Sequence, residues 1–160
     1  MLLGDGSPTQ HLRLLTGNEV HVELIGMEQD SHPNLNAPKE IQELKPPLLR
    51  RQVWLICGSE VMAWAESWWN IKEAENHLKN KHQPIWQSLT QGRSELFRQV
   101  DGLSLVNADW LEKHFGLTGP FWSRHYRFFR HQRELTVIRE VFNPKLETWL
   151  GRAPRQNIKT

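Results

Sequence analysis

The chain has 160 residues and a formal net charge of +2, from 20 basic and 18 acidic residues that form no Lys/Arg block. This length fits one domain with one hydrophobic core, and the even charge distribution argues against nucleic-acid binding while it suits small anions. Cys57 is the only cysteine, which excludes an internal disulfide and a cysteine-rich metal site. Since no long apolar run or secretory leader pattern is present, we expect a cytoplasmic protein without a membrane partner.

The N-terminal third predicts a helix, a strand and a long loop. Residues 4–17 have a helix N-cap at Ser7, a proline suited to the first turn at Pro8 and a terminating Gly17. The helix either packs on a sheet or offers backbone donors to an anion, although Pro8 has no N–H to donate. Residues 19–27 alternate as a half-exposed strand, and residues 28–47, with four prolines, predict either a flap over a pocket or a surface loop, with a helical turn near 39–44.

The sequence from 51 to 70 predicts a β-hairpin with a tight turn at 57–60. Its first strand is apolar on both faces, which is typical of a strand inside a sheet rather than at an edge. Arg51 is the exception on that strand. A guanidinium stays protonated and is rarely buried alone, so we expect it to need a carboxylate from the protein or from a ligand.

The rest of the chain predicts further short helices and strands. Helices are expected near 70–80 and 84–89 and, as a surface helix ended by Gly116, at 107–115. A strand kinked at Gly102 is expected over 94–105, and two long strands with a turn near 131–134 follow residue 119. Residues 151–160 are expected to form a frayed tail. The whole predicts a single α+β domain, 1–160, built on one antiparallel sheet of about six strands.

Two further charged residues fall on apolar strand faces. Glu140 alternates with Ile138 and Phe142, and Arg124 alternates with aromatic residues of the preceding strand. Burying such charges unpaired costs several kcal/mol, on the order expected for buried ions. Either Arg51, Glu140 and Arg124 form a closed ion-pair network, or Arg51 reaches solvent, or the three residues surround a small, cyclic, multiply anionic substrate.

Five segments carry a resemblance to a known family, in chain order LLGDGSPTQHLRLLTG, RQVWLICGSEVMAWAESWWN, PIWQSL, GPFWSRHYRFF and REVFNP. In these segments the sequence resembles the chorismate lyase (chorismate pyruvate-lyase) family, in particular its short photosynthetic-lineage branch. The resemblance implies a six-stranded antiparallel sheet with short helices and flap-like loops over a closed pocket, and no cofactor or metal. It also implies conversion of chorismate to 4-hydroxybenzoate and pyruvate, feeding prenylquinone biosynthesis of the plastoquinone or ubiquinone type.

The resemblance also implies site residues. The family's pocket arginine, at the start of a REILL-like strand, matches Arg51, and its pocket glutamate, in a TELFLP-like motif, matches Glu140. Arg51 is expected to pair a substrate carboxylate or polarise the departing ether oxygen, and Glu140 to transfer a proton near the 4-hydroxyl. Ile85 matches a leucine of a PLG-like turn that contacts substrate, and Arg124 is a candidate for the second carboxylate.

Two positions depart from the family pattern. Pro8 stands where the family has the methionine of a DSMT-like opening, so a backbone donor to substrate is missing there, and Glu66 replaces a basic residue, which predicts different pocket gating. Residues 107–119 resemble an insertion. An alternative to the enzyme is a domain of the same fold that binds an aromatic acid without turnover. Some repressors carry such effector domains beside a DNA-binding segment, for which we find no room in 160 residues, and we expect a monomer.

Overall fold

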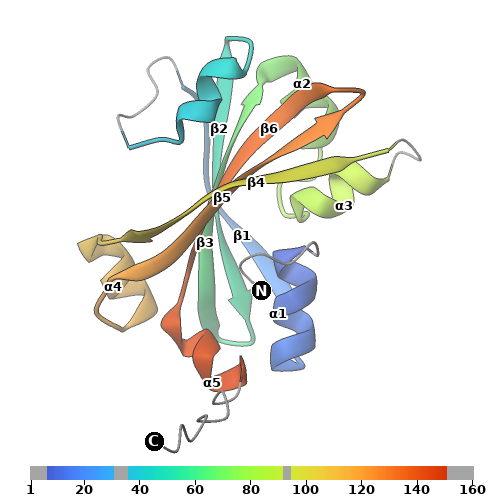
Figure 1. Ribbon diagram of the computed structural model, residues 1–160. Helices are drawn as coiled ribbons and strands as arrows, with labels where there is room; N and C mark the ends of the chain where they lie inside the picture. The colour runs from blue at the N-terminus through green and yellow to red at the C-terminus, as the bar shows by residue number, and fades with distance from the viewer. Residues whose placement is uncertain (1–6, 31–35, 92–94, 151–160) are drawn as a thin grey trace, which may run out of the picture.

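A computed structural model describes residues 7–30, 36–91 and 95–150. These residues form one six-stranded antiparallel sheet in the order β1-β2-β3-β6-β5-β4, with short helices on both faces (Figure 1). The strands are β1 (Val20–Asp30), β2 (Leu48–Cys57), β3 (Glu60–Asn70), β4 (Phe97–Val106), β5 (Phe121–Arg130) and β6 (Arg133–Phe142). The helices are α1 (Pro8–Thr16), α2 (Ile71–His77), α3 (Ile85–Thr90), α4 (Asp109–Phe115) and α5 (Glu147–Leu150), with 3-10 turns η1 (Lys39–Glu43) and η2 (Pro144–Leu146). The predicted α+β class is confirmed.

The β2–β3 hairpin lies in the interior of the sheet, as its two apolar faces predict. β1 pairs with one side of the hairpin and β6 with the other. The three later strands therefore return toward the hairpin, so that β4, the first of them in the chain, becomes an outer edge. This order brings β6 next to β3. The residues paired there, such as Ala65 with Glu140 and Ser67 with Ile138, are more than sixty positions apart in the sequence.

The first face of the sheet is the one that carries Arg51, Val53, Ala65, Tyr126 and Glu140. It is covered by α1, α2 and α3, which lie together on one side of the sheet in Figure 1. Two clusters of buried apolar side chains fill this layer. One contains Leu12 of α1 and the middle of β2, and the other contains Leu89 of α3 with Tyr126 and Ile138.

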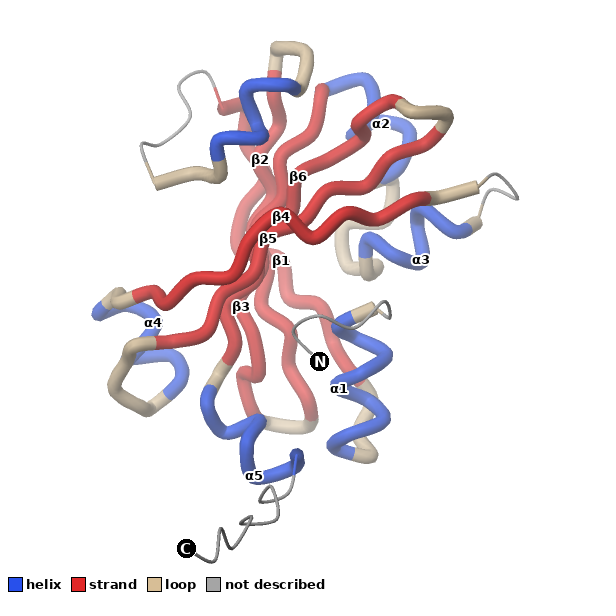
Figure 2. The backbone as a smooth tube through the Cα atoms, viewed as in Figure 1, coloured by secondary structure: helices blue, strands red, loops and turns tan. Residues whose placement is uncertain are grey.

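The second face carries Arg50, Gln52, Trp64, Glu66 and Arg139. Figure 2 shows α4 on the side of the sheet away from α1, α2 and α3. There α4 packs against Trp54, Trp64, Phe121 and Val141 through Leu111 and Phe115, both of which are buried. The surface helix predicted at 107–115 is therefore anchored by one apolar side, and Gly116 ends it in the left-handed conformation.

The described part of the predicted flap covers the second face. β1 continues to Asp30, and residues 36–47 follow with η1 near the predicted position. Ile41 and Leu44 of this segment pack against Trp68 and Val137. Residues 36–47 therefore do not cover the first face of the sheet, because their apolar side chains bury against the opposite face. Residues 31–35 and the predicted tail, 151–160, lie outside the described residues.

The sequence signal at Gly102 also has a clear outcome. The kink predicted at Gly102 is a register shift between Val100 and Gly102 in the pairing of β4 with β5. No group of three His, Cys, Asp or Glu residues with metal-site geometry occurs in the described ranges. Among the helices described, none has the length and apolarity needed to cross a membrane.

Candidate active site

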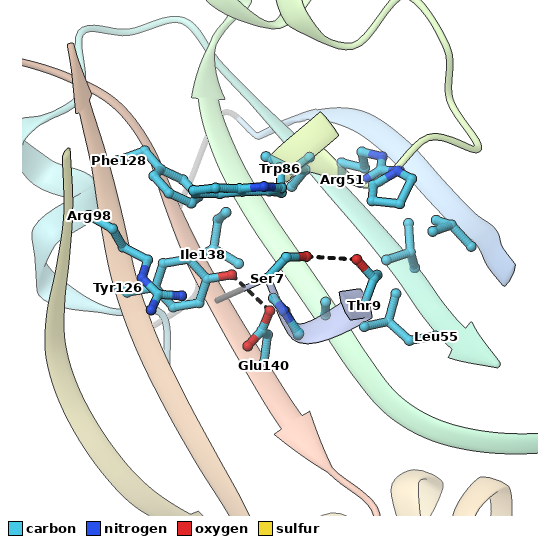
Figure 3. Close-up of a pocket in the computed structure, with 16 residues that line it drawn as sticks. Ser7, Thr9, Arg51, Leu55, Trp86, Arg98, Tyr126, Phe128, Ile138 and Glu140 are labelled. Atoms are coloured by element: carbon cyan, nitrogen blue, oxygen red, sulfur yellow. Dashed lines mark hydrogen bonds between the residues drawn. The ribbon is translucent and has the colours of Figure 1, made fainter. Parts of the chain in front are cut away.

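A small cavity lies between the first face of the sheet and the helices α1 and α3. Its volume is about 40 Å³, and Figure 3 shows the side chains around it. The cavity is lined by Ser7, Pro8, Thr9, Val22, Arg51, Val53, Leu55, Ala65, Pro84, Ile85, Trp86, Arg98, Tyr126, Phe128, Ile138 and Glu140. At roughly 10–15 Å³ per water, the space holds about three water molecules, and its walls are mostly apolar.

Arg51 enters the cavity from β2 with only 2% of its surface exposed. Its Nη2 donates to two backbone carbonyls, Lys81 O at 2.8 Å and Gln83 O at 3.3 Å, while Nε has no partner among residues 7–30, 36–91 and 95–150. No carboxylate of the described chain forms an ion pair with it. Burial lowers the pKa of Arg51 to about 10, so the guanidinium remains protonated at neutral pH. The site thus contains a buried positive charge that only neutral groups solvate.

Glu140 enters the same cavity from β6 and is held from both sides. Arg124 lies directly opposite it on β5 and donates from Nε to Oε2 at 2.7 Å. The Tyr126 hydroxyl donates to Oε1 at 2.8 Å. Burial, followed by the adjacent Glu140 carboxylate, raises the pKa of Tyr126 well above its usual value, so the phenol keeps its proton and remains a donor. Glu140 is therefore fixed as an acceptor at the cavity wall.

Arg51 and Glu140 lie on different sides of the cavity in Figure 3. They belong to β2 and β6, which are separated by β3, and their levels on β3, Ser67 and Ala65, are two residues apart. Two strand spacings across the sheet and two residues along it put their backbones about 12 Å apart. Ala65 of β3 is paired with Glu140 on one side and with Val53 on the other, and its methyl group is the small side chain between the charges. A ring with acidic substituents matches the separation of the charges, while the cavity of about 40 Å³ has to widen to hold it.

Of the remaining predicted residues, the structure brings some to the cavity and leaves others away from it. Pro8 and Ile85 line it. Arg124 does not line it and is completely buried behind Glu140, so it contacts the carboxylate rather than the cavity. Glu66 lies on the second face and does not line the cavity either. The closed network of Arg51 with Glu140 and Arg124 is wrong, because only Arg124 pairs with Glu140, and Arg51 does not reach solvent.

Several lining residues were not predicted. Arg98 of β4 brings a second cation, with its guanidinium 5.4 Å from the Tyr126 ring centre. Trp86 of α3 lies against Phe128, with ring centres 5.9 Å apart. The hydroxyls of Ser7 and Thr9 form a hydrogen bond of 2.7 Å at the start of α1. Arg98 shares its strand face with Leu96 and Val100, which pack against the first-face core, and this alternation was the sequence signal for its inward orientation.

An outer hollow of about 170 Å³ adjoins the cavity and shares Ser7, Thr9, Pro84 and Trp86 with it. The other residues around this hollow belong to α1, α3 and the start of β1. The shared residues, which we call the partition, therefore lie between the cavity and the outer hollow, at the place where α1 meets α3. Trp86 is the largest side chain of this partition.

Comparison with known proteins identifies the family. The family model described as "Chorismate pyruvate-lyase Rv2949c-like" matches residues 2–150. The chain belongs to this family. It is 32% identical over 145 residues to the uncharacterized protein ycf21 of Cyanophora paradoxa, covering 90% of this chain and 75% of the relative. It is 33% identical over 150 residues to ycf21 of Porphyra purpurea, covering 93% and 82%. The predicted resemblance to a photosynthetic lineage is confirmed.

Solved structures with the same fold include bacterial regulators. The effector domain of PhnF from Mycobacterium smegmatis superposes with a TM-score of 0.66 at 10% identity, covering 89% of this chain and 91% of that domain. The longer PhnF chain gives the same TM-score, and 66% of it is covered. A possible transcriptional regulator from Bacillus subtilis, YydK, gives 0.65 at 12% identity, with 85% and 63% covered. At this identity the likeness concerns the fold alone.

Proposed function

We propose that this protein is a chorismate lyase that converts chorismate to 4-hydroxybenzoate and pyruvate. One observation carries the proposal. Arg51 is a buried cation at the wall of the cavity, and no carboxylate of the described chain neutralises it. A charge in this position costs free energy unless an anion is bound, and chorismate, the substrate in the family's name, has one carboxylate on its ring and a second on its enolpyruvyl ether.

The geometry supports a particular placement of substrate. Arg51 binds a carboxylate or polarises the ether oxygen that leaves, and Arg98 adds positive potential at the opposite wall beside Tyr126. Phe128, Ile138 and Trp86 provide flat apolar surfaces for the ring. Pro8 shapes the wall without donating a hydrogen bond, so the substrate contacts at α1 come from the hydroxyls of Ser7 and Thr9.

The reaction needs placement and charge balance more than a nucleophile. The ring C–O bond to the enolpyruvyl group breaks, the ring carbon that bears the hydroxyl loses its hydrogen as a proton, and the enolpyruvate methylene gains a proton to give pyruvate. Aromatisation of the ring drives this elimination. Glu140, held by Arg124 and Tyr126 at the wall opposite Arg51, is the group positioned to transfer the proton. Arg51 stabilises the negative charge that develops on the departing oxygen.

The small volume of the cavity determines how substrate enters. A cavity of about 40 Å³ is smaller than a cyclic diacid, so the partition formed by Trp86 and the start of α1 must move aside. Closure of the same partition then excludes water from the reacting ring. We place the reaction in the cytoplasm, in a monomer, with the product used as the aromatic head-group precursor of plastoquinone or ubiquinone.

A second function is favoured by one feature of the site. Both oxygens of Glu140 already accept hydrogen bonds, which suits a fixed recognition element as well as a proton carrier. Related folds occur in the effector domain of PhnF and in the ligand-binding domain of a GntR-family transcriptional regulator of Bordetella bronchiseptica. Under this alternative the cavity binds 4-hydroxybenzoate or a similar acid and performs no chemistry.

One experiment separates the two functions. Purified protein is incubated with chorismate, and 4-hydroxybenzoate is followed by absorbance, with pyruvate measured in parallel. The enzyme predicts equal amounts of both products, and a reduction of at least about 100-fold in Glu140→Gln, typical of loss of a general acid or base. Binding of 4-hydroxybenzoate without product from the wild type would establish the alternative. Full activity of Glu140→Gln would remove that residue from the proposed chemistry.

A further inference from the structure

A second hollow lies on the second face of the sheet, and we call it the groove. Its volume is about 620 Å³. Arg50 and Gln52 of β2, Trp64 of β3, Arg139 of β6 and Trp110 of α4 line it, together with the end of β4 at 104–107. None of its lining residues lines the first-face cavity. The groove is therefore a separate site, and nothing proposed above uses it.

The base of the groove carries an excess of one positive charge. The Glu66 side chain is completely buried between two arginines. Arg50 donates to it from Nε at 3.0 Å and Nη2 at 2.6 Å, and Arg139 donates from Nε at 2.6 Å and pairs through Nη2 as well. Two guanidiniums and one carboxylate leave a net charge of +1. The exposed Glu28 carboxylate, 3.9 Å from Arg50, offsets this net charge only weakly, because solvent screens the Arg50–Glu28 pair.

Both arginines keep donors available after pairing with Glu66. A guanidinium has five N–H groups, and Glu66 uses two from each arginine, while the carbonyl of Asn36 takes one more from Arg139. The side chains of Arg50 and Arg139 are 23% and 20% exposed. Since Glu66 holds both side chains in place, their remaining donors are preorganised for a further acceptor at the groove.

A buried indole N–H gives independent evidence for a ligand. Trp64 is 4% exposed and lines the groove, and its Nε1 has no acceptor in the described part of the chain. A buried donor without a partner costs about 1–3 kcal/mol. Trp110 lies next to it, with ring centres 5.1 Å apart, and is 43% exposed. One wall of the groove is thus an accessible aromatic surface beside an unsatisfied donor.

We propose that the groove binds a small organic acid with a flat ring. The carboxylate accepts from the remaining donors of Arg50 and Arg139, and a polar atom of the ligand accepts from the Trp64 N–H. The ring packs against Trp110. This arrangement neutralises the net charge of the triad, satisfies the buried donor and covers exposed aromatic surface with one molecule.

Benzoate serves as the probe, and the Trp64 indole N–H resonance, assigned with Trp64→Phe, reports binding in ¹⁵N-labelled full-length protein. We expect a saturable shift of this resonance in the wild type and equally in Arg51→Gln, which alters the cavity on the other face. Trp110→Ala should weaken the affinity at least about tenfold. Trp149→Ala removes a tryptophan of similar exposure, 48%, on α5 and should leave the affinity unchanged. Acetate, which lacks the ring, should bind at least about tenfold more weakly.

Four results would overturn the proposal. They are the absence of a saturable shift with millimolar benzoate, unchanged affinity in Trp110→Ala, equal affinity for acetate, and loss of the shift in Arg51→Gln, which would assign benzoate to the cavity instead. Because Trp110 is partly exposed and outside the charged triad, its replacement tests the groove without removing a buried ion pair. Arg139→Gln should likewise weaken benzoate binding if the variant folds.

Discussion

The two faces of the sheet use neighbouring residues of the same three strands in opposite ways. On β2 and β6, Arg50 and Arg139 face the groove, whereas the adjacent Arg51 and Glu140 face the cavity. The difference lies on β3 between them. Glu66 points to the second face and forms ion pairs with both arginines there, while the small Ala65 points to the first face and offers no charge to Arg51 or Glu140. A carboxylate on the middle strand therefore joins the two charges of the second face into one triad, whereas a methyl group leaves the two charges of the first face apart.

The largest expected effect comes from breaking the ion pair that holds Glu140. Arg124→Leu leaves a buried carboxylate with only the Tyr126 hydroxyl, and we expect a loss of roughly 3–5 kcal/mol in the free energy of unfolding. The matched variant on the second face, Arg50→Leu, should cost less, about 1–2 kcal/mol, because Glu66 keeps Arg139. Urea denaturation measures both. Equal losses would mean that the two carboxylates are held alike.

The next prediction is that replacing Arg51 lowers activity strongly and changes stability little. Arg51→Met removes a buried cation without a carboxylate partner, so the free energy of unfolding should change by less than about 1 kcal/mol. Turnover of chorismate should nevertheless fall by about 10²–10³ in kcat/KM, as expected for loss of a preorganised charge. Product assays and urea denaturation on the same preparation test this. A large destabilisation with normal turnover would make Arg51 a structural residue.

A smaller effect depends on pH and belongs to the second face, where Glu134 lies near Arg127. Burial raises the pKa of Glu134 to about 7, and the carboxylates of Glu43 and Asp101 add to the rise, while Arg127 opposes it. The folded state therefore holds this proton more tightly than the unfolded chain does. The stability it contributes is present below about pH 4.5 and is lost as pH rises through about 7.

Glu134→Gln removes this ionisation. The variant should match the wild type near pH 4.5 and exceed it by about 2 kcal/mol at pH 8.5, because one pKa unit corresponds to about 1.4 kcal/mol and solvent screening reduces the effect of the full shift at this partly buried carboxylate. Urea denaturation at both pH values measures the difference. A wild type that is more stable than the variant at pH 8.5 would show that the Arg127 pair outweighs the burial of the charge.

The sequence predicted much of the fold because its local signals were strong. Two apolar faces placed the β2–β3 hairpin inside the sheet, Gly17 and Gly116 marked helix ends, and Gly102 marked an irregular strand. Alternation along a strand also assigned Arg51 and Glu140 each to an apolar face of its own strand. The family resemblance then connected these two residues to one pocket.

The partners of the charges could not be predicted, because alternation assigns a residue to a face without saying which strand lies beside it. Only the adjacency of β3 with β6 and of β5 with β6 shows that Glu140 meets Arg124 across one ladder and Ala65 across the other. Arg98 was not predicted as a site residue for the same reason. Its strand, β4, lies at the far edge of the sheet from β2, and the strand order that brings it to the cavity of Arg51 could not be derived from alternation. The face that residues 36–47 cover could not be predicted either, because a loop sequence carries no strand period.

The smallest predicted effect is a change in stability when glycines of the two edge strands are replaced by alanine. Gly102 of β4 and Gly26 of β1 each lie at a register shift in an outer strand. A Cβ at Gly102 would lie 2.4 Å from Cε1 of His125, whereas at Gly26 nothing in the described chain lies within 4 Å. The His125 ring is also fixed by Glu40 of η1, at 3.2 Å, so it has to give up that contact to make room.

Gly102→Ala should therefore lower the free energy of unfolding by about 1 kcal/mol, a small steric effect at the edge. Gly26→Ala should be neutral or slightly stabilising, because alanine reduces the freedom of the unfolded chain and meets no atom in the fold. Thermal and urea denaturation of the two variants provide the comparison. If both glycines tolerate alanine equally, the His125 ring moves without cost, and the contact with Glu40 does not help to hold η1 over the second face.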